Sequence, residues 1–362
     1  MTARLLGIGR FESPNLMPQA QAAEISAALA GVDDRGARRM NAVFRRAGVE
    51  TRSGVSLVES EEGLVHRWLH ERGPGPDACP GTGDRIDQFM AIAPDMACAA
   101  TRDALERAGF RPDEVTHVVT VSCTGFASPG VDHHLIDRLG LPRSTRRTNI
   151  GFMGCHAALN GLRVATAFAR AEPEAVVVVC CVEVCSVHFQ GGDSRDAMLA
   201  NALFADGSAA AVVSAREPRT GPAPELRASV SEFLPDSTDL MTWTVTDQGF
   251  RMTLAPEVPD RLEAAVGDWA RAWLGAEGYA IEDLRGWAIH PGGPQIIDAV
   301  RDSLGIDESH CAPSRAMLAR LGNMSSPTVL HILAGLQASE TPLPWAAMAF
   351  GPGLSAEGLL LV

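Results

Sequence analysis

The chain has 362 residues, and its 31 basic and 44 acidic side chains give a formal charge of −13. At roughly 150 residues per domain, this length predicts about two to three domain-sized units. Hydrophobic residues make up 46% of the chain and charged residues 21%, which excludes a disordered protein. The acidic balance argues against nucleic acid as a partner, because a general attraction to phosphates needs a basic surface.

All 31 basic residues are arginine, since the sequence contains no lysine. A P-loop nucleotide site requires a lysine, and Schiff-base enzymes require an amine nucleophile, so both classes are excluded. The chain contains one tyrosine, Tyr279, which disfavours phenolic acid–base chemistry. The chemistry of any site is therefore expected to rest on other side chains.

Helices and apolar strands alternate through the first half. Helical spacing of apolar residues covers 87–109 and ends on a glycine, and a polar turn then leads to a strand at 116–125. A second helix is expected at 156–171, followed by an apolar strand that begins at 175 and another strand at 208–214. Alternation of this kind predicts an α/β fold whose strands are covered on both faces.

The second half repeats this order. A helix is expected at 259–278, a polar turn follows, and a strand comes next at 285–294. The same helix–turn–strand unit occupies 104–125, so the order indicates an internal duplication although individual residues differ. The last segment, 345–362, predicts two strands joined at a glycine-rich turn.

A proline-rich segment, 216–226, is the most plausible boundary between the halves. We therefore divide the chain into an N-terminal half, 1–220, and a C-terminal half, 221–362. Each half then contains one copy of the repeated unit.

The longest apolar run, 175–182, has eight residues and is too short to span a bilayer. The first residues, 1–15, contain no apolar core of signal-peptide length. We therefore expect a protein that does not span a membrane and that resides in the cytoplasm.

Eight cysteines are spread along the chain, and in a cytoplasmic protein they are better interpreted as thiols than as a disulfide framework. Cys180, Cys181 and Cys185 are close enough in sequence to suggest metal ligands. Their segment, 174–189, is rich in β-branched residues, and strand alternation would send Cys180 and Cys181 to opposite faces. We therefore expect thiols packed in the core.

Three polar residues stand where loops join regular elements. Cys155 lies at the start of the expected helix 156–171, where a helix N-terminus would lower the pKa of a thiol; a buried residue in a turn is the alternative. His290 ends a strand before proline and glycine residues, which allow close approach, and a structural histidine is the alternative. Asn323 precedes a helix, where an N-cap or turn residue is the alternative.

Together, Cys155, His290 and Asn323 fit the requirements of thioester chemistry. A cysteine can attack an acyl thioester, and an imidazole can form an ion pair with the thiolate. Histidine and asparagine can both donate hydrogen bonds to a developing enolate oxygen. The duplicated halves would bring their strand ends to one shared site.

At these residues the chain resembles a known family, the type III polyketide synthases, which are the chalcone synthase-like branch of the thiolase fold. The resemblance covers nearly the whole chain and is carried by GFMGCHAALNGLR, ALFADGSAA, WAIHPGGPQIID, GNMSSPTVLHIL and AFGPGLSAEG, in that order. The motifs WAIHPGGP and GNMSS distinguish it from the related ketoacyl synthase III enzymes. Within the family, the chain looks most similar to bacterial alkylresorcinol and alkylpyrone synthases.

The resemblance implies a thiolase-like fold of αβαβα layers built from two duplicated halves. It implies that Cys155 carries the acyl chain and that His290 and Asn323 decarboxylate malonyl-CoA. Phe204 matches the family's gatekeeping phenylalanine between the CoA entrance and the cavity. The second gatekeeper, a phenylalanine in plant enzymes, is Met252 here, which suggests a softer wall.

Further substrate-binding positions follow from the same alignment. Cys123 falls at a cavity-lining position, and Trp243 falls where plant enzymes have glycine, so the cavity must have a different shape; core packing is the alternative for Trp243 and Met252. Ser128 matches the residue that reaches into the partner's cavity in the family's dimers. Arg39 matches a basic residue that faces CoA phosphates, with a solvated helix face as the alternative. The cyclisation loop of the family corresponds to Gly351, Pro352 and Gly353.

The resemblance predicts an iterative enzyme that condenses malonyl-CoA with an acyl-CoA starter, most plausibly a long-chain fatty acyl group. The expected product is an alkylresorcinol, an alkylresorcylic acid or an alkylpyrone. We expect a homodimer with no metal or other cofactor, since CoA thioesters are the substrates. The alternatives are a single-condensation enzyme similar to ketoacyl synthase III and a non-catalytic acyl-CoA-binding protein of the thiolase fold.

Overall fold

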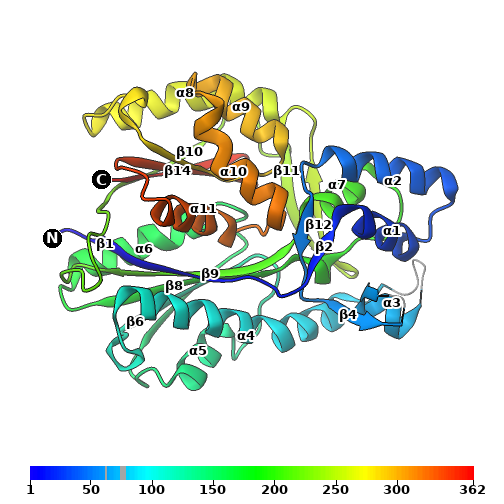
Figure 1. The fold of residues 1–362 in the computed structure, drawn as a ribbon, viewed down its shortest axis with the longest axis horizontal. Coiled ribbons are helices and arrows are strands. Elements are labelled where there is room, and N and C mark those ends of the chain that lie inside the picture. The colour runs from blue at the N-terminus through cyan, green and yellow to red at the C-terminus, as the bar shows by residue number, and fades with distance from the viewer. Residues whose placement is uncertain (62, 74–78) are drawn as a thin grey trace.

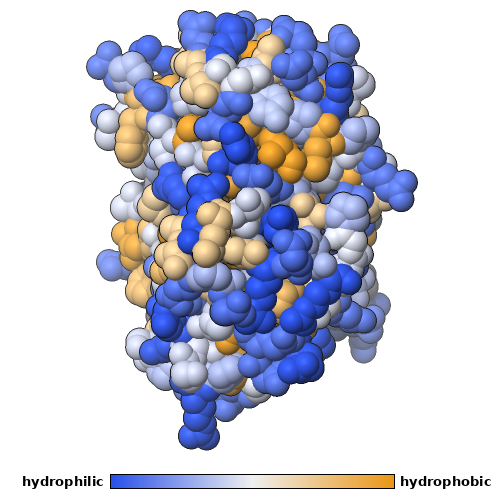
Figure 2. Space-filling model, turned by 90° about the vertical axis from the view of Figure 1, so that its left-hand side faces the viewer, coloured by the Kyte–Doolittle hydropathy of each residue, from blue (hydrophilic) through white to orange (hydrophobic). Residues whose placement is uncertain are grey.

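The computed structural model describes residues 1–61, 63–73 and 79–362. Two sheets and three layers of helices are stacked in the order α–β–α–β–α, and both termini lie at the same edge of the layers (Figure 1). Hydrophilic side chains cover most of the molecular face at that edge, and hydrophobic side chains appear there in small groups (Figure 2). The predicted α/β class is confirmed.

The first sheet has the strand order β1-β9-β8-β6-β7. These strands are β1 (Arg4–Phe11), β9 (Asp206–Ser214), β8 (Val176–Val184), β6 (His117–Ser122) and β7 (Arg146–Gly151). The β1–β9 and β9–β8 pairs are antiparallel, whereas β8–β6 and β6–β7 are parallel. The strands expected at 116–125, 175 onward and 208–214 are therefore all neighbours in one sheet.

The second sheet has the order β10-β15-β14-β13. Its strands are β10 (Leu226–Phe233), β15 (Ser355–Leu361), β14 (Trp345–Gly351) and β13 (Gly286–Ile289). The β10–β15 and β15–β14 pairs are antiparallel, and the β14–β13 pair is parallel. The strands β1, β9, β8 and β6 of the first sheet pair in the same pattern. The predicted duplication and the predicted closing hairpin, β14–β15, are both present.

Helices fill the space between the sheets and cover their outer faces (Figure 1). The central layer contains α6 (Ala157–Ala171) and α11 (Pro327–Ala338), and α10 (Glu308–Leu321) packs beside it on β13. The outer face of the first sheet is covered by α4 (Thr82–Ala108) and α5 (Val131–Leu139). The outer face of the second is covered by α8 (Val258–Ala276) and α9 (Pro294–Leu304).

The remaining helices and three short ribbons surround the edge of the layers opposite the termini (Figure 1). Three two-stranded ribbons are formed by β2 (Leu16–Pro18) with β3 (Thr51–Ser53), β4 (Leu57–Ser60) with β5 (Gly63–His66), and β11 (Met241–Thr246) with β12 (Gly249–Leu254). The helices there are α1 (Gln19–Ala30), α2 (Asp34–Arg46), α3 (Arg67–Arg72) and α7 (Arg195–Leu203). Short 3-10 turns are η2 (Pro112–Glu114), η3 (Cys185–His188) and η4 (Ile281–Asp283).

The strand β8 shows how the core is divided. Every residue of β8 is buried, and Cys180 packs in the hydrophobic cluster that includes α4, whereas Cys181 packs in the cluster around α6 and α11. The predicted alternation is confirmed, because a buried strand sends successive side chains to opposite layers. Across the described residues, no helix combines the length and the apolar character needed to cross a bilayer.

Candidate active site

A cavity of about 160 Å³ lies where the C-terminal ends of several strands meet the ribbon β11–β12, α1 and α7. Cys155, His290 and Asn323 all line it, although they come from three distant segments. Five further residues expected from the resemblance also line it: Cys123, Phe204, Trp243, Met252 and Pro352. The fold thus brings most of the predicted site together.

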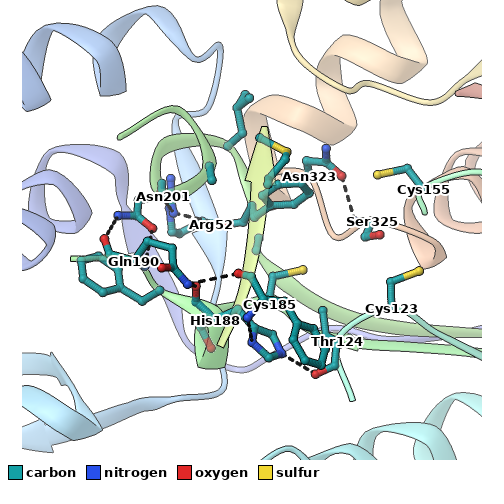
Figure 3. Close-up of a pocket in the computed structure, with 18 of the residues that line it drawn as sticks. Arg52, Cys123, Thr124, Cys155, Cys185, His188, Gln190, Asn201, Asn323 and Ser325 are labelled. Atoms are coloured by element: carbon teal, nitrogen blue, oxygen red, sulfur yellow. Dashed lines mark hydrogen bonds between the residues drawn. The ribbon is translucent and has the colours of Figure 1, made fainter. Parts of the chain in front are cut away.

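Cys155 stands at the N-terminal end of the central helix α6, directly after a tight turn. Gly154 in that turn has φ 82°, a left-handed conformation that favours glycine. A Cβ on Gly154 would lie 2.3 Å from Cδ of Pro352, so glycine is also required by the close approach of the loop after β14. The thiol faces Asn323 and Ser325 (Figure 3).

Desolvation dominates the pKa of the Cys155 thiol. Burial raises its pKa to about 11, while hydrogen bonds from the side chains of Ser325 and Asn323 act in the opposite direction. The net shift is opposite to the lowering expected from the helix N-terminus. The largest cause is desolvation, which disfavours the charged thiolate.

His290 follows β13, and its backbone N–H donates to the carbonyl oxygen of Met348 at 2.8 Å. The side chain is 1% exposed, and neither ring nitrogen has a hydrogen-bond partner among the described residues. Burial, together with electrostatic repulsion from His156, lowers the pKa of His290 to about 3. Both shifts favour the neutral forms of the thiol and the imidazole over an ion pair.

Asn323 lies between α10 and α11, and its side chain is fixed by the backbone. Its Oδ1 accepts a hydrogen bond of 2.8 Å from the N–H of Ser325, which has the left-handed φ of 60° (Figure 3). The Nδ2 group is consequently the donor that this side chain offers. The backbone of Asn323 forms a parallel β-bridge with Phe204, so these two residues are held together.

The wall opposite these residues is formed by the ribbon β11–β12. Trp243 is directly paired with Met252 across this ribbon, so both side chains lie on the same face. The indole Nε1 of Trp243 donates to the carbonyl oxygen of Cys123 at 2.8 Å, and its ring centre is 6.4 Å from that of Phe204. The two positions that depart from the plant enzymes thus form one continuous part of the cavity lining.

Cys123 is held by its surroundings on two sides. Its Sγ accepts a hydrogen bond of 3.0 Å from the N–H of Gly154, and its own N–H donates to Glu183 at 2.9 Å. The Glu183 carboxylate also accepts from the hydroxyls of Thr124 at 2.7 Å and Ser326 at 2.6 Å. The sequence analysis missed Glu183, although a charged residue within an apolar strand is a signal of such a buried network.

Four predicted residues do not line the cavity. Arg39 lies on the exposed face of α2, where its Nη1 is 3.1 Å from Asp193. Ser128 is exposed on the loop between β6 and α5. Gly351 packs against His156, since a Cβ there would lie 2.4 Å from the imidazole, and Gly353 forms the turn between β14 and β15.

A second buried network, also missed from the sequence, begins beside the nucleophile. The Nδ1 of His156 lies 2.7 Å from Oδ1 of Asn160, and Nδ2 of Asn160 donates to Glu357 at 2.8 Å. The Nε2 of His156 lies 2.8 Å from the hydroxyl of Ser355. This network connects α6 of the first half to β15 of the second, next to Cys155.

Cys155, His290 and Asn323 bring a thiol, an imidazole and an amide to the cavity, and these groups suit a carbonyl substrate. Within the part of the chain that the structure describes, no cluster of three or more histidine, cysteine, aspartate or glutamate side chains is arranged to hold a metal ion.

Family models account for almost the whole chain. The N-terminal domain model of chalcone and stilbene synthases matches residues 2–218, and the C-terminal domain model of the same family matches 225–362. The chain belongs to the chalcone and stilbene synthase family. It is a type III polyketide synthase, and therefore an acyltransferase-type enzyme of the thiolase fold.

Curated relatives of this type III polyketide synthase include proteins of very different length. An alpha-pyrone synthesis polyketide synthase-like protein, Pks18 of Mycobacterium tuberculosis, is 34% identical over 284 residues, which cover 76% of this chain and 72% of the relative. The probable polyketide synthase 1 of Dictyostelium discoideum is 33% identical over 333 residues and 89% of this chain. The match spans only 10% of the length of that relative.

Solved structures of type III polyketide synthases have the same architecture. PKS-I of the brown alga Ectocarpus siliculosus superposes with a TM-score of 0.91 at 27% identity, over 99% of this chain and 98% of the other. The C-terminal type III domain of the Dictyostelium hybrid Steely1 superposes with a TM-score of 0.90 at 28% identity, over 100% and 99%. The layered thiolase fold predicted from the motifs is confirmed.

Proposed function

We propose that this type III polyketide synthase loads an acyl-CoA starter on Cys155 and extends it repeatedly with malonyl-CoA. The observation that carries the proposal is His290, which is buried in the cavity wall with both ring nitrogens unbonded among the described residues. A buried polar group without a partner is costly, and a substrate oxygen at this place would remove that cost. Cys155 and Asn323 line the same cavity.

Loading begins from the neutral pair of groups. The imidazole of His290 accepts the thiol proton as the sulfur of Cys155 attacks the thioester carbonyl carbon. The carbon–sulfur bond to CoA then breaks, and the leaving CoA sulfur takes up that proton.

Extension uses the same donors on a different oxygen. The carboxylate of malonyl-CoA leaves as carbon dioxide, and its bonding electron pair forms an enolate whose oxygen accepts hydrogen bonds from His290 and Asn323. The enolate carbon attacks the acyl carbonyl on Cys155, and the carbon–sulfur bond breaks to release the Cys155 side chain as a thiolate. The lengthened chain is then transferred back to Cys155 for the next cycle.

The starter is a long-chain fatty acyl group, and the product an alkylresorcinol, alkylresorcylic acid or alkylpyrone. Trp243 supports this starter because its indole occupies space that a compact aromatic starter would need. Beyond the catalytic residues, the cavity lining is largely apolar, as at Ile25, Leu29 and Leu57. The name of the mycobacterial relative, which refers to alpha-pyrone synthesis, agrees with a pyrone product.

The enzyme acts as a cytoplasmic homodimer on CoA thioesters, without a further cofactor. Ser128 lies on an exposed loop with Phe126, which is 54% exposed, and the ring centre of Phe126 is 5.8 Å from that of Phe152. Met153, 40% exposed, follows Phe152. Exposed apolar side chains of this kind favour burial against a second copy of the chain.

The test is to incubate the enzyme with malonyl-CoA and a length series of acyl-CoA starters, and to identify the products by mass. Cyclised products with at least two added two-carbon units, formed best from long starters, are expected. A product extended once would favour the alternative of a ketoacyl synthase III-like enzyme. No incorporation of radiolabelled malonyl carbon would favour a non-catalytic acyl-CoA-binding protein.

A further inference from the structure

Arg52, at the centre of β3, carries a partly buried charge that the reaction described above does not use. Burial lowers its pKa to about 10, so the guanidinium remains charged at neutral pH. All five of its N–H groups are directed at neighbouring oxygens. The acceptors, with donor–acceptor distances, are Gln19 Oε1 (3.1 Å from Nε and 2.6 Å from Nη2), Asn201 O (2.6 Å), Ala202 O (2.5 Å) and Phe204 O (3.1 Å).

Three of these acceptors are backbone carbonyls at the C-terminal end of α7. A helix C-terminus has unpaired carbonyl groups and partial negative charge, and a cation there satisfies both. In Figure 3, Arg52 lies beside Asn201, across the cavity from Cys155. The planar fork of the guanidinium holds several oxygens in one fixed arrangement, which a lysine ammonium cannot reproduce.

The segment that Arg52 holds is the segment that fixes Asn323. The N–H of Asn323 donates to Leu203 O at 2.9 Å, and the N–H of Ala205 donates to Asn323 O at 2.8 Å. Arg52 binds the carbonyls of Ala202 and Phe204, on either side of Leu203. Contacts to the guanidinium and to Asn323 therefore alternate along one short stretch of backbone.

We propose that Arg52 is a positioning residue for the decarboxylation of malonyl-CoA. It touches none of the reacting atoms, and it acts by holding the 201–205 turn on which Asn323 and the gatekeeper Phe204 depend. An oxyanion donor must be placed accurately, and a displacement of about 1 Å can cost roughly a hundredfold in rate. The inference rests on the proposed function, because it assigns the donor role to Asn323.

The two steps of the reaction should respond differently to a change at Arg52. Loading of Cys155 depends on the thiol and on His290, neither of which is hydrogen bonded to the 201–205 turn among the described residues. Decarboxylation depends on the amide of Asn323 in addition. A substitution of Arg52 is therefore expected to slow the decarboxylation of malonyl-CoA and to leave the acylation of Cys155 unchanged.

The experiment compares Arg52→Lys with Arg85→Lys, a matched control. Arg85 is buried and also donates to backbone carbonyls, at 2.6 Å to Val187 and 2.8 Å to Phe189, but not to the 201–205 turn. For Arg52→Lys, we expect kcat for malonyl-CoA decarboxylation to fall about tenfold to a hundredfold at little changed KM, while acylation of Cys155 stays within about twofold. For Arg85→Lys, we expect both rates to change by the same factor.

Chemical rescue separates positioning from general destabilisation. Arg52 lines the cavity, so Arg52→Ala leaves a space that a guanidinium ion can enter from the substrate side. Millimolar guanidinium should restore decarboxylation in Arg52→Ala by about tenfold, with no gain in Arg52→Ala/Asn323→Ala or in wild type, and urea should restore nothing. If Arg52→Ala does not fold, the lysine variant carries the test alone.

The inference is wrong if Arg52→Lys decarboxylates malonyl-CoA at the wild-type rate. It is also wrong if loading and decarboxylation fall by equal factors, or if guanidinium leaves a folded Arg52→Ala variant unchanged. A wild-type enzyme that does not decarboxylate malonyl-CoA would instead overturn the proposed function. The two failures are therefore distinguishable.

Discussion

The indole of Trp243 is hydrogen bonded to the backbone carbonyl of Cys123 over 2.8 Å. This contact joins the ribbon β11–β12 of the second half to the end of β6 in the first, at the cavity wall. Because the bond fixes the indole orientation, Trp243 acts as a rigid boundary of the cavity. Met252, directly opposite on the ribbon, supplies the flexible part of the same wall.

Replacing Trp243 by alanine should widen the range of starters. Removing the indole opens space beside Phe204, so bulky aromatic acyl-CoA starters should gain about tenfold in kcat/KM relative to long fatty starters. Competition between two acyl-CoA starters, followed by product mass, measures this ratio. Thr244→Ala, an exposed neighbour on the opposite face of the ribbon, is the control and should leave the ratio unchanged. An unchanged ratio in Trp243→Ala would show that the starter does not approach this wall.

Asn323→Ala should separate loading from extension. Loss of one oxyanion donor typically costs about two to three orders of magnitude in rate, so release of carbon dioxide from malonyl-CoA should fall by that amount. Acylation of Cys155 should persist and is seen as an adduct by intact-protein mass spectrometry. Decarboxylation near the wild-type rate would remove Asn323 from the mechanism.

The reactivity of Cys155 in the empty enzyme should follow a high pKa. Since the thiolate is the reactive form and the pKa is about 11, alkylation by iodoacetamide should accelerate about tenfold per pH unit between pH 7 and 10. Peptide mapping measures modification at Cys155, and Cys155→Ala identifies the background and should form no acyl adduct. A rate that is already constant below pH 8 would instead indicate a thiolate–imidazolium ion pair with His290.

Acid should destabilise the protein through its buried histidines. Burial lowers the pKa of His66, His188 and His331 to about 4 and that of His290 to about 3. Histidines in the unfolded chain titrate near 6.5, so between about pH 6.5 and 4 the unfolded state binds protons that the native state does not. The contribution of these histidines to the free energy of unfolding is therefore complete above about pH 6.5 and is lost as the pH falls toward about 4.

Near pH 5 these four histidines together contribute a loss of about 5 kcal/mol per pH unit to the free energy of unfolding. Urea denaturation at a series of pH values measures the slope. His331→Gln removes one of the four groups and should reduce the slope by about a quarter. An equal slope in that variant would contradict the buried, neutral state of His331.

Local sequence patterns predicted helices and strands well where the pattern depends on that one helix or strand alone. The glycine that ends the predicted helix 87–109 is the left-handed residue after α4, with φ 72°, although the helix begins earlier, at Thr82. The alternation around Cys180 and Cys181 placed both thiols correctly, because strand geometry alone decides the faces. The motifs also located the residues that line the cavity.

Properties that depend on distant segments could not be derived in this way. The pKa of Cys155 is governed by burial among loops from both halves, not by its own helix end. Arg52 and Glu183 were missed because their partners lie far along the chain, at 201–204 for Arg52 and at 122–124 and 326 for Glu183. No local pattern records such contacts.

The β11–β12 ribbon is a separate two-stranded sheet, whereas Cys155 and His290 stand at the ends of elements in the layered core. Under the proposed function, catalysis and substrate choice are anchored to different parts of the molecule. Exchanges at Met252 are then expected to alter which chain is accepted while the layered core that carries the reacting groups is kept. Selection for new products can therefore act on the ribbon while the chemistry is inherited unchanged.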